Sequence, residues 1–497
     1  MAVLCLALIF LQIGPVSADT SIVASVGRFV ITAHDLMDSY EFGPAFLKRK
    51  PDALRAHLEY MIYERLIALE AERLRYDTTR FVRDRVFALE EDLAVDELYR
   101  DEILSRVNLT EEEIGIGVVK ARTNIRLRWI FTQDMFEATQ IARKLEEGVP
   151  FDSLYALQFS PPERPDERVL ETTLLELERN NPEFASQIAQ IRSQEVTAPL
   201  EGPDGFYIVR VDEIWQNPLL TESEYQALKV EAVKVLRMVN ADQLAKEYVH
   251  TMLIAANPVM KAAGFNIVRA YLAEKGLSRD TRIQWDIPST FMTEAGPLPI
   301  TASGEFVSRP LVSFAGQALT VRDYLRWFDI RQFQLKTSSL KSFNSSVKRT
   351  IWKMVQDNLL SQEAYWRGTD LRDTIQQETR KWEAKLLYLA GRSHLMRTIT
   401  ISDADVKRRF EEQQHQYVDG SGKLLSFDQA RQHVWADLYR EEERRVLLRA
   451  IQRLRKNYPV IVHEDIVRQL SSRIQRELSP IDVIFYKPGG TFPRVAF

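Results

Sequence analysis

Helical spacing of apolar residues dominates two regions that lie far apart in the chain. In each region, apolar side chains recur every three or four positions, which places them along one face of a helix. The first set is Leu54, Leu58, Met61, Ile62 and Leu66, and the second set is Val347, Ile351, Met354, Val355 and Leu359. Each region therefore predicts a helix with one buried face.

The two predicted helices belong to segments with the same layout. Before each of them a short apolar run ends in Thr-x-x-Asp, at Thr32–Asp35 and at Thr320–Asp323. This spacing is a variant of the capping box, in which the two side chains bond to free backbone N–H groups at a helix start. Further on, residues 54–77 align without a gap onto residues 347–370. We infer an internal repeat.

Each copy continues through a long charged helix to a second start signal, at Thr110 in the first copy and at Ser402 in the second. The copies correspond to helical units at 19–123 and 311–416. Helices with one apolar stripe bury it by packing together, so the predicted fold class is α+β and mostly helical. The alternative is an ordinary helical bundle that was duplicated for stability.

Residues 124–216, between the two copies, alternate between strand and helix signals. An apolar strand at 125–131 is followed by an amphipathic helix that ends at Gly148. A hairpin at 195–211, with its turn at Pro203-Asp204-Gly205, closes the segment. We expect a small antiparallel sheet wrapped by helices.

This segment resembles the parvulin fold of peptidyl-prolyl isomerases. The family's Pro-x-Phe helix start is present at Pro182–Phe184, although the Gly-Gly-rich turn that normally precedes it is absent. Parvulins carry one histidine in the first strand and one in the last, both facing a groove for an X-Pro peptide. At the matching places this chain has Trp129 and Tyr207. The resemblance implies a degenerate parvulin domain with a peptide-binding groove at Trp129, Phe184, Tyr207 and Asn180.

A helical unit followed by a parvulin-like segment is the layout of SurA-type, PrsA-type and PpiC-type foldases. The chain resembles them over most of residues 20–216, and again over about 311–416. Prolyl isomerisation has a barrier of about 18–20 kcal/mol, and an isomerase must favour the twisted amide over the planar one. Loss of both histidines removes much of that preference, so the resemblance implies peptide binding with little isomerase activity. The alternative is that the aromatic residues only fill the core of a small domain.

The rest of the chain adds helices and one short strand. The expected segments are a helical arm at 217–279, an irregular connector at 280–310, a C-terminal helical region at 417–476 and a tail at 477–497. The short apolar run at Val460–Val462 predicts a strand. We hypothesise that it pairs with Leu311–Phe314 and closes the second helical unit.

The amino terminus has the pattern of a secretory signal peptide at residues 1–18. The apolar run from Met1 to Leu11 is too short to span a bilayer, and Val16-Ser17-Ala18 suits cleavage before Asp19. No lysine or arginine precedes the run, which departs from the usual pattern. Cys5, the only cysteine, lies in this leader, so no disulfide is expected in the mature chain. We expect a soluble protein exported to the periplasm.

Charge and histidine placement argue against several classes of function. A net charge of −4 disfavours nucleic acid as a partner. The 7 histidines are scattered without metal-ligand spacing, and residues 419–423 lack the glycine spacing of a phosphate loop. No cofactor, metal or nucleotide is expected. The pattern favours an ATP-independent foldase or chaperone for unfolded secreted or outer-membrane proteins. The alternatives are an active peptidyl-prolyl cis-trans isomerase and an envelope scaffold that binds one folded partner.

Overall fold

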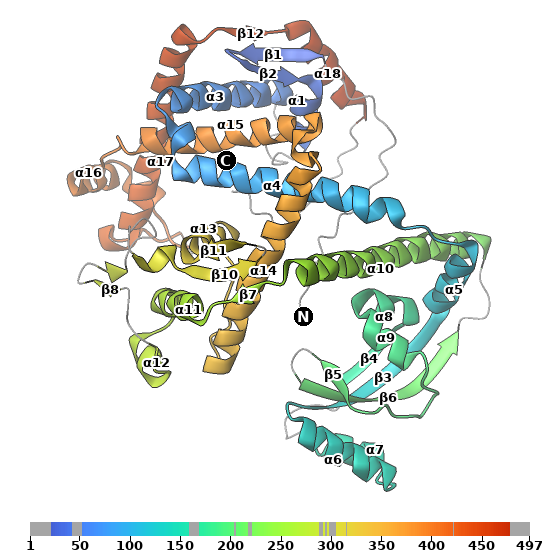
Figure 1. The fold of residues 1–497 in the computed structure, drawn as a ribbon. Coiled ribbons are helices and arrows are strands. Elements are labelled where there is room, and N and C mark those ends of the chain that lie inside the picture. The colour runs from blue at the N-terminus through green and yellow to red at the C-terminus, as the bar shows by residue number, and fades with distance from the viewer. Residues whose placement is uncertain are drawn as a thin grey trace. The chain divides into compact units, whose positions relative to one another are not determined.

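The computed structural model describes residues 21–41, 52–158, 168–202, 205–216, 221–287, 292–293, 296–297, 305–314, 316–420 and 422–477. These residues are mostly helical, with small antiparallel sheets, as the sequence predicts (Figure 1). They form two compact units. Unit 1 spans Asp96–Val259, and unit 2 holds the described residues up to Val95 and from Met260 onward. The predicted leader at 1–18 lies outside the described residues.

Unit 1 contains a four-stranded antiparallel sheet with the strand order β4-β3-β6-β5. Its strands are β3 (Thr123–Thr132), β4 (Val169–Thr173), β5 (Leu200–Gly202) and β6 (Gly205–Gln216). Its helices are α6 (Met135–Glu146), α7 (Phe151–Ala156), α8 (Leu174–Asn180) and α9 (Pro182–Ile188). The sheet and its covering helices are those expected between residues 124 and 216. The edge strand β4 was not expected, because its residues show no clear alternation of apolar and polar side chains.

The two faces of this sheet are buried against different helices. One face packs on α8 and α9 through Ile125, Leu127 and Val211, and through Ala185 and Ile188 of α9. The other face packs on α7, through a second cluster of side chains. Its buried members are Ile130, Phe151, Leu154, Tyr155 and Ile208. Because side chains alternate along a strand, successive residues of β3 serve opposite faces.

Two further helices complete unit 1, namely α5 (Glu111–Arg122) and the long α10 (Glu222–Ala256). Both start at capping boxes, formed by Thr110 and by Thr221. Gly117 of α5 faces α10 so closely that a Cβ on it would lie 2.8 Å from the Leu236 side chain. A glycine at this place lets the two helices approach each other.

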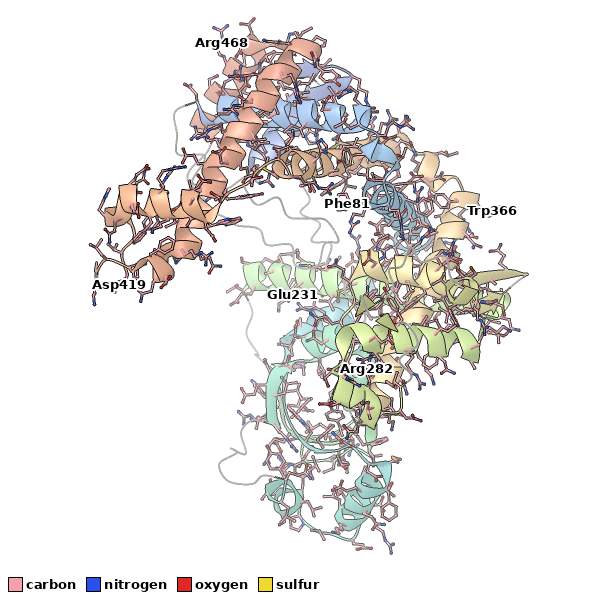
Figure 2. The ribbon with its side chains drawn as sticks, turned by 90° about the vertical axis from the view of Figure 1, so that its left-hand side faces the viewer. Phe81, Glu231, Arg282, Trp366, Asp419 and Arg468 are labelled. Carbon is pink, nitrogen blue, oxygen red and sulfur yellow. The ribbon has the colours of Figure 1, made fainter. Side chains whose placement is uncertain are left out.

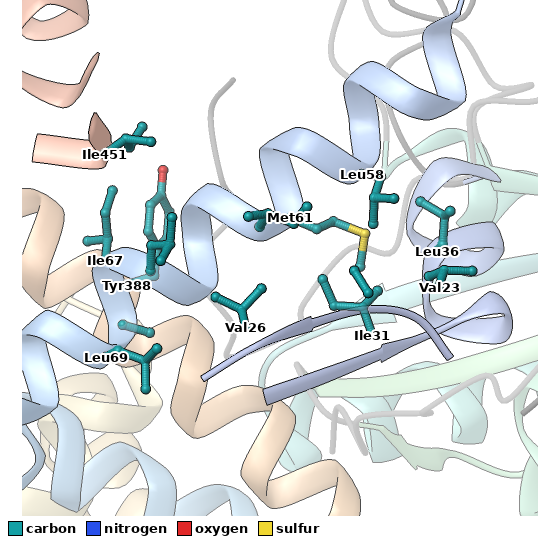
Figure 3. Packing of buried hydrophobic residues seen from close by; sticks show 14 of the residues in the cluster. Val23, Val26, Ile31, Leu36, Leu58, Met61, Ile67, Leu69, Tyr388 and Ile451 are labelled. Atoms are coloured by element: carbon teal, nitrogen blue, oxygen red, sulfur yellow. The ribbon is translucent and has the colours of Figure 1, made fainter. Parts of the chain in front are cut away.

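Unit 2 contains two three-stranded sheets, and we call the group of elements around each sheet a lobe. Lobe 1 has the strands β1 (Ile22–Val26), β2 (Phe29–Thr32) and β12 (Val460–Val462). Its helices are α1 (Ala33–Glu41), α3 (Ala53–Arg73), α15 (Asp373–Met396), α17 (Phe427–Asn457) and α18 (Glu464–Glu477). Tyr388 of α15 and Ile451 of α17 belong to the same buried cluster as Ile67 of α3 (Figure 3).

The proposed pairing of Val460–Val462 with Leu311–Phe314 is wrong. The strand β12 pairs instead with β1, with Val462 opposite Ala24 and Val460 opposite Val26. The backbone N–H of Gly27 also donates to the carbonyl of Pro459 at 3.0 Å. The following helix α18 buries Val467 and Leu470 in the core of lobe 1, which holds β12 at this sheet.

Lobe 2 has the strand order β11-β10-β7. Its strands are β7 (Val259–Met260), β10 (Pro310–Phe314) and β11 (Gln317–Thr320), and its helices are α11 (Ala262–Gly276), α13 (Val321–Arg331) and α14 (Leu340–Trp366). The N–H of Lys261 donates to the carbonyl of Leu311 at 2.8 Å. A Cβ on Gly264 would lie 2.5 Å from the Pro310 carbonyl oxygen, so α11 passes β10 at a distance that only glycine allows.

The remaining elements connect these parts. They are α4 (Arg80–Glu102), α12 (Arg279–Gln284), α16 (Asp403–Gln413), the two-residue strands β8 (Met292–Thr293) and β9 (Gly296–Pro297), and the short 3₁₀ helices η1 (Tyr76–Thr78), η2 (Leu104–Arg106), η4 (Glu305–Ser308), η5 (Thr369–Leu371) and η6 (Gln414–Gln416). The helices α16 and α17 enclose a small core of their own, which includes Val406, Phe410 and Val434. The connector expected at 280–310 contains most of α12.

Candidate peptide-binding face of unit 1

Three of the four predicted groove residues border one apolar cluster on the sheet of unit 1. Trp129 lies opposite Val209, and Phe131 lies opposite Tyr207, in the pairing of β3 with β6. The alternation of side chains along each strand puts Trp129 and Tyr207 on the same face. Both side chains are half-buried, and both pack against the cluster that includes Leu127 and Val209.

Phe184 reaches the same cluster from the start of α9. Pro182 occupies the first turn of that helix, where a missing N–H costs nothing. The side chain of Asn181 caps the helix by accepting a hydrogen bond from the Phe184 N–H at 3.0 Å. The cap fixes the backbone from which the half-buried Phe184 side chain extends. Asn181 was not among the predicted groove residues.

Asn180, the fourth predicted groove residue, is the exposed last residue of α8. Its side-chain N–H donates to the Glu176 carboxylate at 3.2 Å, within the same helix. The residue next to it, Asn181, makes the contact with the Phe184 backbone. A role for Asn180 in the groove stays a prediction.

Two glycines make room for the aromatic side chains at one end of the sheet. The rings of Phe131 and Tyr207 lie 5.1 Å apart between centroids, with their planes tilted by 52°. A Cβ on Gly202 would lie 2.4 Å from the Tyr207 ring, and one on Gly205 would lie 2.9 Å from the Phe131 ring. Larger side chains at these glycines would displace the aromatic pair, so the hairpin of β5 and β6 supports this part of the face.

The opposite face of the sheet carries a network of charges that the sequence analysis did not single out. Arg128 and Arg210 both bond to Asp212 and to Asp152, with distances between 2.5 and 3.1 Å. The Arg210 guanidinium also lies 4.7 Å from the centre of the Phe151 ring. Burial lowers the pKa of Arg128, but its bonds to Asp212 and Asp152 outweigh this effect and raise it. Two arginines and two aspartates cancel in charge, so the network joins β3, β6 and α7 without leaving a free charge.

The described residues contain no group of three or more His, Cys, Asp or Glu side chains that could hold a metal ion. Across the same part of the chain, no helix is both long and apolar enough to cross a membrane.

Comparisons with known proteins give similarity to solved structures only. No protein-family model matches the chain, and no curated protein matches it in sequence. It is similar to the solved structure of the peptidylprolyl isomerase PrsA from Bacillus anthracis, with 15% identity over 39% of this chain and 96% of that chain, at a TM-score of 0.22. A PrsA structure from Bacillus cereus has 14% identity over 47% of this chain and 92% of the other, at a TM-score of 0.21.

A third similar structure comes from a study of two SurA-like chaperones of Campylobacter jejuni, PEB4 and the periplasmic protein Cj1289. It has 12% identity over 48% of this chain and 98% of that chain, at a TM-score of 0.22. PrsA and SurA-like proteins are the kind that the sequence motifs led us to expect. The identities and TM-scores are low, so this likeness assigns no activity to the chain. The chain is similar to solved structures of PrsA and of SurA-like proteins.

Proposed function

We propose that the protein is an ATP-independent foldase or chaperone that binds unfolded polypeptides, and that the face formed by Trp129, Phe184 and Tyr207 holds an apolar peptide segment. The observation that carries this proposal is the half-buried position of all three aromatic side chains around one cluster. Aromatic side chains with a polar N–H or O–H tip suit a surface that is apolar at its base and wet at its rim.

Binding at such a face should be weak. Release takes place without nucleotide hydrolysis, and an unfolded client loses conformational freedom when it is held. A dissociation constant of roughly micromolar, about −8 kcal/mol of binding free energy, is tight enough to hold an unfolded client and weak enough to let it dissociate. Clients are expected to be secreted or outer-membrane proteins, because the amino terminus has the pattern of a signal peptide for export to the periplasm.

The proposal includes two copies of one helical unit, and the hairpin that begins each copy lies in unit 2. The hairpins β1–β2 and β10–β11 carry a register shift at the same place, between Ile22 and Ala24 and between Pro310 and Val312. Both following helices start at the predicted Thr-x-x-Asp signal, with Asp35 and Asp323 each accepting from a threonine.

The correspondence continues along the helices, where equivalent residues of the two copies are separated by a constant number of positions in the sequence. Arg75 and Gly368 both have a left-handed backbone before a 3₁₀ turn. The next helices, α4 and α15, then begin at Arg80 and Asp373. These agreements in local geometry support a duplication rather than two unrelated bundles.

The copies exchange parts between the lobes. Lobe 1 takes α15 from the second copy and β12 from the C-terminal region, and lobe 2 contacts α4 of the first copy through Asp92 and Ala94. Each lobe is therefore completed by the other copy. We propose that this exchange links the two lobes into a single structural unit.

The proposal can be tested with the chain from Asp19 onward and an unfolded, aggregating client. Light scattering should fall when the protein is present, without added nucleotide. The double variant Trp129→Ala/Tyr207→Ala should suppress aggregation less well, while Leu157→Ala, at an 80% exposed position of unit 1, should match the natural sequence. Failure of the natural sequence to suppress aggregation of any client would rule out the chaperone function.

A second candidate function is prolyl isomerisation, which the position of Phe184 favours. The Asn181 cap accepts a hydrogen bond from the Phe184 backbone N–H. By resemblance, Phe184 matches the phenylalanine that parvulins place below the proline ring. Turnover of a proline-containing peptide that is lost in Phe184→Ala would support an enzyme. A rate equal to the uncatalysed one would leave the face as a binding surface.

A further inference from the structure

Three exposed apolar side chains lie on α14, η5 and α4 of lobe 2, two of them close to the end of α14. Trp366, the last residue of α14, is 78% exposed, and Leu371, the last residue of η5, is 74% exposed (Figure 2 labels Trp366). The hydroxyl of Thr369 donates to the carbonyl of Ala94 at 2.9 Å, so α4 runs beside η5. Phe87 lies two turns before Ala94 on the same face of α4 and is 54% exposed. We call Phe87, Trp366 and Leu371 the apolar patch.

The fold does not require apolar residues at these places. At the constant spacing that relates the two copies, the equivalent residues are Arg380, Arg73 and Thr78, and all three are exposed. Lobe 1 therefore forms with polar side chains where lobe 2 has the apolar patch. Exposed aromatic and aliphatic side chains that contribute little to packing mark an interaction surface.

The carboxylates beside the patch are compensated only in part. Among the described residues, Glu90, Glu91 and Asp370 have no ion-pair partner, since the nearby Arg331 is held by both oxygens of Asp92. Burial, together with Asp370, raises the pKa of Glu90. Burial raises the pKa of Glu91 to about 7, with neighbouring carboxylates adding to the shift and Arg331 opposing it.

Lobe 1 has an arginine at a turn position where lobe 2 has a glycine. Glu383, the equivalent of Glu90, also has a pKa raised by burial, but the charge of Arg28 opposes this shift. Arg28 occupies the second turn position of the β1–β2 hairpin, and Gly316 occupies that position in the β10–β11 hairpin. The hairpin of lobe 2 therefore supplies no arginine at the position that Arg28 has in lobe 1.

We propose that the apolar patch is a docking surface for unfolded client segments in which aromatic or aliphatic side chains stand next to lysine or arginine. The apolar side chains of the client cover Trp366, Leu371 and Phe87. Its cations lie against Glu90, Glu91 and Asp370, where a positive charge relieves the repulsion among the carboxylates. The inference rests on the chaperone function proposed above and names the chemistry of the client at a second surface.

The test uses fluorescein-labelled peptides and the whole chain from Asp19 onward. One 14-residue probe contains Phe, Leu and Lys separated by Gly and Ser, and its sibling has Glu in place of Lys. We expect tighter binding of the Lys probe in fluorescence anisotropy. The triple variant Phe87→Gln/Trp366→Gln/Leu371→Thr should weaken that binding about tenfold, a change typical of losing aromatic anchors at an interface. The double variant Glu90→Gln/Glu91→Gln should remove the preference for the Lys probe.

A matched control is available on α17. Trp435 is 45% exposed and stacks on Tyr439, with 5.1 Å between the ring centroids. Trp435→Gln should bind both probes like the natural sequence. Where the triple variant loses its helical circular dichroism, Trp366→Gln alone serves, since its side chain lies mostly in water, and about threefold weaker binding is expected.

The two proposals fail in different ways. If the natural sequence suppresses aggregation but the patch variants bind the Lys probe equally well, the docking surface is wrong and the chaperone function stands. If the natural sequence neither binds the probes nor suppresses aggregation, the chaperone function itself is wrong.

Discussion

Lobe 1 and lobe 2 share a layout but differ in how they neutralise charge between their helices. In lobe 1, Lys385 of α15 pairs with Glu64 of α3, whose side chain is only 7% exposed. The equivalent positions in lobe 2 carry Asp92 and Asp357, two acidic residues. Arg331 bonds to Asp92, and the Trp327 ring N–H donates to Asp357 at 3.1 Å.

A second difference lies one residue away. Glu91 of α4 occupies the position that the buried Ala384 occupies on α15. Lobe 1 thus has a small apolar side chain where lobe 2 has a carboxylate with a raised pKa. Matched charges and a small side chain favour a stable scaffold, whereas excess carboxylates beside exposed aromatic residues favour a surface that takes up a cationic partner. Under the docking proposal, one layout serves as a scaffold in lobe 1 and as a client-binding surface in lobe 2.

The largest expected effect comes from breaking the charge pair of lobe 1. Lys385→Met leaves the Glu64 carboxylate buried without its cation, which costs about 3 kcal/mol of unfolding free energy. Urea unfolding measures this loss. The control is Lys353→Met in lobe 2, where the partner Asp357 also accepts from Trp327 and the lysine is 44% exposed, so a loss below about 1 kcal/mol is expected. Equal losses in the two variants would contradict the difference between the lobes.

Much of this architecture follows from local patterns in the sequence. Thr32 and Thr320 start helices as predicted, because a capping box depends only on residues three positions apart. The antiparallel sheet around Trp129 and Tyr207 also follows from alternation and turn residues. The predicted resemblance to PrsA-type and SurA-type proteins agrees with the solved structures that the chain resembles.

Contacts between the copies could not be predicted in the same way. Val460–Val462 reads as a strand, but its three residues fit the edge of either hairpin, and the choice of β1 depends on α18 placing Val467 in the core of lobe 1. The partner of Glu64 likewise lies more than 300 residues away, on Lys385, and no local spacing connects them. Pairing over such distances is set by the packing of whole helices, which periodicity alone does not determine.

A smaller effect should come from the close approach of α11 to β10 in lobe 2. Gly264→Ala puts a methyl group 2.5 Å from the Pro310 carbonyl oxygen, and moving a backbone to relieve this costs about 2 kcal/mol. Gly276→Ala, on the same helix with no atom within 4 Å, should cost nothing. Hydrogen exchange should show faster exchange in residues 310–320 but not in residues 22–32. Faster exchange in both hairpins would mean that the two lobes open together.

Acidity should affect the two lobes differently through Glu91. Its folded pKa of about 7 lies above the ordinary value of 4.5, so the protonated form favours the folded state. The stabilisation is complete below pH 4.5 and is lost as the pH rises through 7, at about 1.4 kcal/mol per pKa unit. Allowing for the part of the side chain in water, the expected loss is about 2 kcal/mol. Hydrogen exchange at residues 310–320 measures this loss of stability, compared at pH 5 and pH 8 between the natural sequence and Glu91→Gln. The same pH response in both proteins would exclude Glu91 as the source of the loss.

The smallest expected effect concerns the capping boxes, where the two lobes are most alike. Thr32→Ala and Thr320→Ala each remove one cap and should each cost about 1 kcal/mol. The acidic partners should differ, because Asp35 also pairs with Lys381 of α15 at 2.7 Å. Burial raises the pKa of Asp35, but its bonds to Lys381 and Thr32 outweigh this and lower it. Asp35→Ala should therefore cost a few tenths of a kcal/mol of unfolding free energy more than Asp323→Ala. Urea unfolding above pH 5 measures this excess. The excess should be absent in a Lys381→Met background. An excess that persists in that background would assign the difference to the cap itself rather than to the helix exchanged between the copies.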